Sequence, residues 1–232
     1  IPVMNQLGIE VYAEAVANGY RIGPNPKPDF ALFRGADGKP LLTPGNTQNI
    51  CPTEVYRQGE YYKGKVIPYF NSLMDKGITH LMANWEPFMF DRRGCFCARC
   101  KTEFIRYSKL PEKEVTANWG SAILEKYRDL WTKFRSWQHG ELVKTLNQTM
   151  NELGKKRFGK ESFFIPMVSY TLFTTPRQHA EYALEDYIDH LQWLEPWGPY
   201  IYYRYEEPYQ ENCGWNIVTW LAAKKMKESV IK

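Results

Sequence analysis

Long apolar runs, blocks of like charge and histidines at metal-ligand spacing are all missing from this sequence. No run approaches the roughly 18 to 20 apolar residues that a membrane-spanning helix needs. The first residues, from Ile1 to Gln6, contain neither the basic stretch nor the small-residue cleavage site of a secretory leader. The 30 Lys and Arg against 26 Asp and Glu leave a net charge of +4, and the basic residues are scattered. We therefore expect no membrane and no nucleic-acid partner.

Aromatic residues are the departure from average composition. The chain contains 8 Trp, 16 Tyr and 12 Phe, which together make up 16% of its residues. Partly polar rings often line sugar-binding clefts, and they also fill the cores of large α/β enzymes. Composition alone leaves these two interpretations open, although 44% hydrophobic residues exclude a disordered chain.

Apolar periodicity alternates between strand and helix along the chain. The pattern predicts strands at residues 8–16, 78–87, 163–170 and 200–205, and helices at residues 66–74, 123–153, 182–194 and 217–230. Gly77 and Gly159 stand where two of these helices should end. Strands that alternate with helices predict right-handed crossovers and a parallel sheet, open or closed.

The chain is predicted to be one domain, residues 1–232, with two elaborated loops. Residues 25–57 are rich in Pro, Gly, Asn and Asp, and Asp37-Gly38 lies between short apolar pieces, which indicates a small hairpin. Residues 88–120 form a cysteine-rich loop and helix. In parallel α/β folds, loops after strands build the active site.

Four of the five cysteines predict a metal site. Cys95, Cys97 and Cys100 form a C-x-C-x-x-C motif just after the second predicted strand, and Cys51 lies in the preceding loop. Four thiolates make a closed tetrahedral zinc site with no position left for water, so such a metal would be structural. A disulfide with leftover thiols, or reduced thiols without a role, are the alternatives. Cys213 stands alone and is expected to be a small buried residue.

Glu86 is the strongest catalytic candidate. It follows a predicted buried strand, at the edge of the sheet where α/β enzymes place their chemistry. A carboxyl beside an indole such as Trp85 can have its pKa raised by desolvation and can then act as a general acid. A surface or loop-capping glutamate is the alternative interpretation.

Several segments together resemble the catalytic domain of family 42 β-galactosidases and related clan A glycoside hydrolases. They are Cys51-Pro-Thr-Glu-Val-Tyr-Arg57, Asn84-Trp-Glu-Pro87, Cys95-Phe-Cys-Ala-Arg-Cys100 and Asn118-Trp-Gly120, and the likeness covers roughly Gly8 to Tyr205. The resemblance implies a (β/α)₈ TIM barrel of which this chain supplies roughly strands 3 to 6. It also implies that Glu86 is the acid/base and that the four cysteines bind zinc, as matching cysteines do in some members.

The sequence departs from the family at one position and is incomplete at another. Trp85 separates Asn84 from Glu86, whereas the family usually has Asn directly before the acid/base. The nucleophile is expected beyond Lys232, at the end of the seventh strand, with Glu206 and Glu207 as the in-chain substitutes. The residues expected to contact the sugar, at or near the carboxyl ends of the strands, are Tyr12, Asn84, Trp85, Tyr170, Tyr203, Tyr205, Glu206 and Glu207.

Three functions follow from these expectations. The first is hydrolysis of β-glycosidic bonds by a retaining two-carboxylate mechanism, supported by a structural zinc site. The second is a non-catalytic carbohydrate-binding relative of the same barrel. The third, a zinc-ribbon interaction module, is the weakest, because ribbons arrange their cysteines as two close pairs. Besides a carbohydrate, the expected partner is the rest of the barrel or a second copy of the chain, which would cover the open strand edges.

Overall fold

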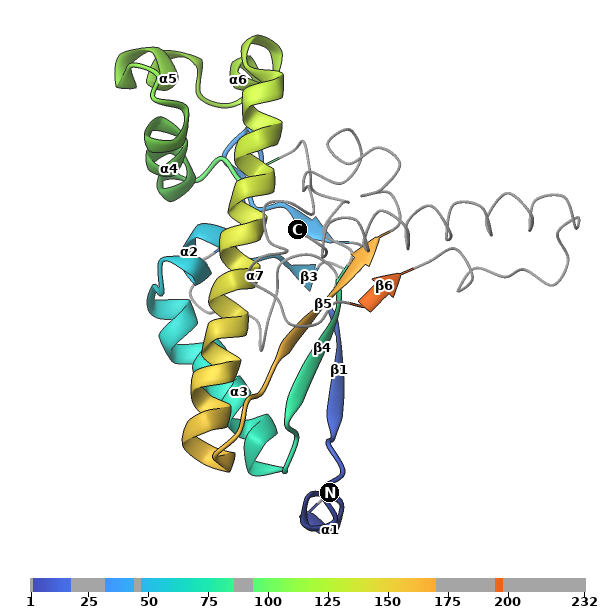
Figure 1. Cartoon of the computed structure of the whole chain (residues 1–232). Coiled ribbons are helices and arrows are strands. Elements are labelled where there is room, and N and C mark those ends of the chain that lie inside the picture. The colour runs from blue at the N-terminus through green and yellow to red at the C-terminus, as the bar shows by residue number, and fades with distance from the viewer. Residues whose placement is uncertain (1, 18–31, 44–46, 86–93, 170–194, 198–232) are drawn as a thin grey trace, which may run out of the picture.

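The computed structural model describes residues 2–17, 32–43, 47–85, 94–169 and 195–197. A parallel sheet of strands β1 (Tyr12–Ala17), β4 (His80–Trp85) and β5 (Phe164–Ser169) forms its centre, with the short strand β6 (Glu195–Trp197) beside β5. The helices α2 (Pro52–Tyr56), α3 (Ile67–Asp75) and α7 (Arg128–Phe158) lie together on one side of this sheet (Figure 1). No helix in these described ranges is long and apolar enough to span a membrane.

The TIM barrel predicted from the sequence is wrong. The described part of the chain is mostly helical, and its small parallel sheet is open, with the strand order β1-β4-β5-β6. Within the described ranges, β1 pairs only with β4, so no closing pair of strands completes a barrel. The prediction failed because open and closed parallel sheets share the same local alternation of strand and helix. Closure depends on which distant strands pair, and periodicity carries no information about that.

Three of the four predicted strands form, and each is shorter than the apolar run that predicted it. The register of β1 on β4 pairs Tyr12 with His80 and Ala17 with Trp85, so both strands end at the same edge of the sheet. The fourth predicted strand, at residues 200–205, lies outside the described residues. Strand β6 forms at Glu195–Trp197, a position where the apolar periodicity predicted no strand. One proline is tolerated there because β6 pairs with a single described neighbour, as an edge strand does.

Two of the four predicted helices, at residues 66–74 and 123–153, lie within the described residues and form, each in two pieces, whereas those at residues 182–194 and 217–230 lie outside the described residues. A π-helical turn, η2 (Tyr62–Val66), precedes α3, and Gly77 beyond its end has a φ of 82°. The long predicted helix is split at Tyr127 into α6 (Ser121–Lys126) and α7. Helix α7 ends at Gly159, whose φ of 68° is the left-handed conformation that glycine adopts without strain. The remaining helices are α1 (Pro2–Gln6), α4 (Ala98–Ser108) and α5 (Glu112–Asn118).

Helix α7 joins two hydrophobic cores. Its carboxyl-terminal half packs Leu142 and Leu146 against the sheet and α3, together with the four cysteines. Its amino-terminal half places Trp131 and Phe134 in an aromatic cluster with α4, α5 and α6. Between these halves lies a short buried polar belt, and its members are Arg135, Ser136, Gln138 and His139. The metal-ligand candidates therefore lie close to the junction between the two cores.

The predicted hairpin around Asp37-Gly38 is confirmed. Arg34 and Pro40 form an antiparallel bridge, and Gly38 occupies the turn with a φ of 77°. A second bridge joins Leu32 to Ile50, and strands β2 (Leu42–Thr43) and β3 (Thr47–Gln48) pair between the two bridges. The hairpin and its two bridges lead directly to Cys51 at the start of α2.

His139 predicts a loss of stability in acid. Burial, together with the positive charge of Arg135, lowers its pKa to about 3, whereas histidine in an unfolded chain titrates near 6.5. The unfolded state therefore takes up the proton first. Stability should be intact above about pH 6.5 and should fall as the pH drops toward 3, by roughly 5 kcal/mol at most from this residue. Urea unfolding of the parent and His139→Gln across this window should show a smaller loss in the variant. Parallel pH profiles would contradict this.

Candidate metal centre

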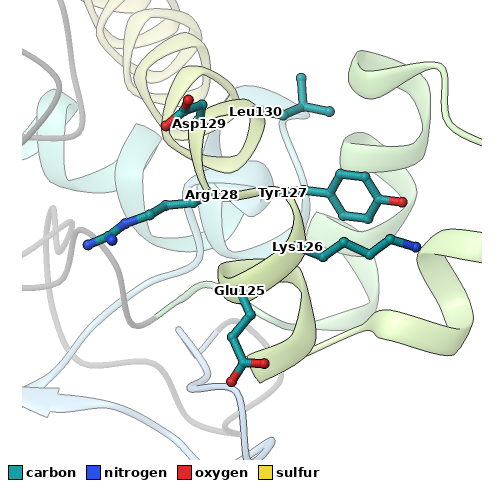
Figure 2. Close-up of a pocket in the computed structure, with 6 residues that line it drawn as sticks. All are labelled: Glu125, Lys126, Tyr127, Arg128, Asp129 and Leu130. Carbon is teal, nitrogen blue, oxygen red and sulfur yellow. The ribbon is translucent and has the colours of Figure 1, made fainter.

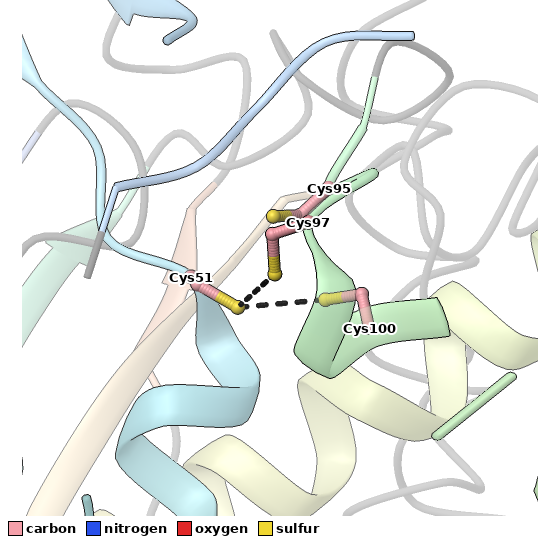
Figure 3. A group of neighbouring side chains, drawn as sticks. All are labelled: Cys51, Cys95, Cys97 and Cys100. Atoms are coloured by element: carbon pink, nitrogen blue, oxygen red, sulfur yellow. Dashed lines mark hydrogen bonds between the residues drawn. The ribbon is translucent and has the colours of Figure 1, made fainter. Parts of the chain in front are cut away.

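Four cysteine side chains converge although Cys51 is remote from the other three in sequence. Cys51 precedes α2, Cys95 lies in the segment between β4 and α4, Cys97 precedes α4, and Cys100 lies in the first turn of α4. All four are buried and reduced, and their sulfur atoms lie within 4.8 Å of one another (Figure 3). The Sγ atom of Cys51 is 3.4 Å from those of both Cys97 and Cys100. The disulfide alternative is therefore not what the structure contains.

The spacing of these sulfurs fits a tetrahedral metal site. Four sulfurs placed about 2.3 Å from a central ion in a tetrahedron would be about 3.8 Å from one another. Two of the observed separations are 3.4 Å and none exceeds 4.8 Å, so they bracket that value, and four cysteines would fill all four coordination positions. The four cysteines can bind a metal ion, and a closed set of this kind suits a structural role, because it leaves no position for water or substrate.

Local backbone structure explains how the cysteine triplet reaches Cys51. A Cβ atom at Gly94 would meet the carbonyl oxygen of Arg34 at 2.4 Å, so only glycine allows the segment before Cys95 to approach the hairpin this closely. Phe96 points away from the cluster and stacks on Trp131 with ring centroids 4.5 Å apart. The alternation of Cys95, Phe96 and Cys97 therefore directs two thiols toward the metal centre and one ring into the aromatic cluster.

Two groups of contacts favour negative charge on the sulfurs. Cys51 and Cys97 occupy the N-cap positions of α2 and α4, where the unpaired amides of a helix carry partial positive charge. Arg99 lies beside them; burial opposes its charge, but the Cys51 and Cys97 thiolates outweigh burial and raise the pKa of Arg99. The Nε atom of Arg99 is also 3.4 Å from the Oε2 atom of Glu54.

The thiols differ strongly in acidity. Burial raises the pKa of the Cys95 and Cys100 thiols. Hydrogen bonds from Cys100 and Cys51 lower the pKa of Cys97. For Cys51, burial acts to raise the pKa, but hydrogen bonds from Cys100 and Cys95 prevail and lower it. The raised pKa values of Cys95 and Cys100 favour their protonated forms, so a metal ion that binds all four sulfurs as thiolates must displace those protons.

Polar groups outside the cysteine motif also reach the sulfurs. The backbone amide of Arg34 donates to the Sγ atom of Cys95 at 3.4 Å. The Oγ1 atom of Thr53 lies 3.2 Å from the Sγ atom of Cys100, and the Nε2 atom of Gln138 lies 3.5 Å from it. The sequence prediction missed all three. A polar Gln138 in the apolar stripe of a long helix was a usable signal that something polar lay opposite it.

The predicted sugar-binding residues fall into three groups. Tyr12 was predicted near the carboxyl end of its strand, and this is wrong: Tyr12 begins β1, is 51% exposed, and stacks on His80 at the amino end of the sheet. Asn84 and Trp85 do end β4, at the carboxyl edge. The remaining candidates lie outside the described residues, and they are Glu86, Tyr170, Tyr203, Tyr205, Glu206 and Glu207.

A surface hollow of about 400 Å³ lies at the bend between α6 and α7 (Figure 2). Its lining is a single consecutive segment, Glu125 to Leu130. Lys126 and Tyr127 in this segment both bond to Glu114 of α5, and the Lys126 Nζ atom lies 2.9 Å from the carboxylate. These bonds hold the bend against α5. The hollow arises where α6 ends and α7 begins, and its lining brings together no residues that are distant in the sequence, as a binding site would.

The comparisons with known proteins identify no relative: no protein-family model, curated protein or solved structure matches this chain.

Proposed function

We propose that this chain is the metal-braced part of a glycoside hydrolase, with zinc held by Cys51, Cys95, Cys97 and Cys100. The single observation that carries the proposal is the convergence of these four sulfurs. The resemblance to family 42 β-galactosidases rests partly on the order of the same cysteines. The resemblance implies these four ligands, and their sulfurs come together from two segments that are distant in the sequence. This convergence supports the proposal.

Zinc is the metal that this ligand set favours. Four thiolates in a tetrahedron suit zinc or iron, whereas magnesium and calcium require oxygen ligands. The centre has no open coordination position, so the ion would brace the fold and take no part in the reaction. It would join the hairpin that ends at Cys51 to the start of α4.

Elemental analysis tests the metal directly. Protein purified under reducing conditions, without added metal, is expected to contain about one zinc per chain, because a closed thiolate site binds zinc tightly enough to retain it. A matched preparation of Cys51→Ser should contain much less. Metal-free parent protein would contradict the zinc proposal. One iron per chain would identify the bound metal as iron and would also contradict zinc.

The catalytic part of the proposal concerns Glu86 and the carboxyl edge of the sheet. Strand β4 ends at Trp85, level with the end of β1, and Glu86 is the next residue in the chain. Crevices at this edge are where open α/β sheets bind ligands. Glu86 would protonate the leaving oxygen and then deprotonate water, while a second carboxylate about 5 to 5.5 Å away attacks the sugar. Within this sequence, Glu206 and Glu207 are the candidates for that second carboxylate.

A further inference from the structure

A chain of buried polar side chains ends on one sulfur of the metal centre. Arg135 on α7 donates from its Nη1 atom to the Oε1 atom of Gln138. The Nε2 atom of Gln138 lies 2.9 Å from the Oγ1 atom of Thr53 and 3.5 Å from the Sγ atom of Cys100. Thr53, on α2, is itself 3.2 Å from that sulfur. Arg135 and Gln138 are fully buried and Thr53 is 2% exposed.

The chemistry of arginine sets the direction of the first bond in this chain. An arginine side chain has donors and no acceptor, so Gln138 must present its carbonyl oxygen to Arg135 and its NH₂ group to the other side. That NH₂ group faces the Thr53 hydroxyl, Cys100 and the Tyr56 hydroxyl, which lies 3.3 Å away. The Thr53 hydroxyl accepts from Gln138, and its own hydrogen can point at the Cys100 sulfur or at the Tyr56 oxygen, which lie equally close at 3.2 Å. A thiolate at Cys100 can only accept, so toward it both the Thr53 hydroxyl and the Gln138 NH₂ group act as donors.

Two converging donors suit an anionic sulfur that acts as an acceptor. A thiolate bound to a metal retains lone pairs outside the coordination bond, and hydrogen bonds to them offset its negative charge and fix its direction. Four thiolates around a divalent ion carry a net charge of −2, which in a buried site needs such compensation. The buried guanidinium of Arg135 lies at the far end of the same chain.

We propose that Thr53 and Gln138 are positioning residues for the metal ion: they hold the Cys100 sulfur in its ligating orientation, and Arg135 orients Gln138. This inference rests on the proposed metal site. It adds that metal occupancy is coupled to α7, because Gln138 connects the long helix to α2 and to α4. The loss of partners outside the coordination sphere typically weakens metal binding about 10- to 100-fold.

The test compares variants that remove one donor each. Thr53→Val retains the shape of threonine and removes the hydroxyl, Thr53→Ser retains the hydroxyl, and Gln138→Met removes only the amide. Thr149→Val is the matched control, because Thr149 is also buried and its hydroxyl contacts Tyr62 and the Thr145 carbonyl rather than a cysteine. Zinc dissociation constants come from competition with a coloured chelator, and sulfur geometry from the absorption spectrum of the cobalt(II)-loaded protein.

Thr53→Val and Gln138→Met are expected to bind zinc about 10-fold more weakly or worse, and Thr53→Ser and Thr149→Val close to the parent. The sulfur-to-cobalt charge-transfer band should move to lower energy in the two weakened variants, because a sulfur without hydrogen bonds donates electrons more readily. If Thr53→Val does not fold, Gln138→Met against Thr149→Val makes the same comparison.

The outcomes separate the two claims. If the parent binds no zinc or cobalt, the proposed metal site is wrong, and this inference is wrong with it. If the parent binds both ions but the two donor-deleted variants match it in affinity and spectrum, only the positioning role is wrong. The same conclusion follows if Thr149→Val weakens binding as much as they do, because the effect would then be general destabilisation.

Discussion

Removal of the metal is expected to destabilise this protein by about 4 kcal/mol or more, which corresponds to a free metal concentration about 1,000 times the dissociation constant. Structural zinc sites in small peptides have apparent binding free energies of about 10 to 16 kcal/mol. Here the folded state has a hydrophobic core of its own, so part of the structure should survive. The segments expected to loosen are the hairpin before Cys51 and the segment around Cys95 and Cys97.

Tryptophan fluorescence can follow this change. Phe96, between two of the ligands, stacks on Trp131, and its carbonyl oxygen accepts the indole N–H of Trp119 at 2.9 Å. Movement of the cysteine segment should therefore alter the environment of both indoles. Urea unfolding of metal-loaded parent, chelator-treated parent and Cys51→Ser, followed by this fluorescence, gives the difference in stability.

The control for Cys51→Ser is Cys213→Ser, the same chemical change at the fifth cysteine of the chain. Serine at position 51 can still cap α2, so a loss of stability there reports the missing sulfur rather than the missing cap. Equal unfolding midpoints for Cys51→Ser, Cys213→Ser and the parent would show that the cysteine cluster does not stabilise the fold.

Substitution of Glu86 by Gln is expected to slow hydrolysis of unactivated glycosides by about 10²- to 10⁴-fold, the usual contribution of a general acid/base. Glutamine preserves the shape of the side chain and cannot transfer the proton. Aryl glycosides with good leaving groups should suffer much less, since their departure needs little protonation. Added azide should restore turnover of these activated substrates, because it attacks the glycosyl-enzyme intermediate without help from a base.

These assays test the proposed glycosidase activity and need a control for general effects of substitution. Glu161→Gln is the matched control, because Glu161 is a half-exposed glutamate, paired with Lys155, just before β5. Equal rates for Glu86→Gln and the parent on an unactivated glycoside would exclude Glu86 as the acid/base. A parent with no activity on any glycoside, but with measurable sugar binding by calorimetry, would favour the carbohydrate-binding alternative. In that alternative, Trp85 between Asn84 and Glu86 marks the departure from the catalytic family.

Local sequence signals predicted several elements of the described part of the chain. Helix α3 ends where Gly77 predicted, and α7 ends at Gly159, because glycine alone adopts the left-handed cap without strain. The strand at His80–Trp85 was visible as an apolar run closed by Pro87. The Asp37-Gly38 turn was readable because these residues favour the backbone angles of a tight hairpin. Each of these signals depends on residues adjacent in the chain.

The sequence by itself determined the strand and helix alternation of the described residues and which four cysteines come together. Thiols are so selective in their chemistry that Cys51 could be assigned to the distant triplet before any geometry was known. Only the tertiary structure decided that the described sheet is open, that Tyr12 lies at the amino end of β1, and that Thr53 and Gln138 reach Cys100. A threonine or glutamine bonds equally well to many groups, and a strand pairs with many edges. Their partners are therefore selected by the packing of the whole chain and not by the residue itself.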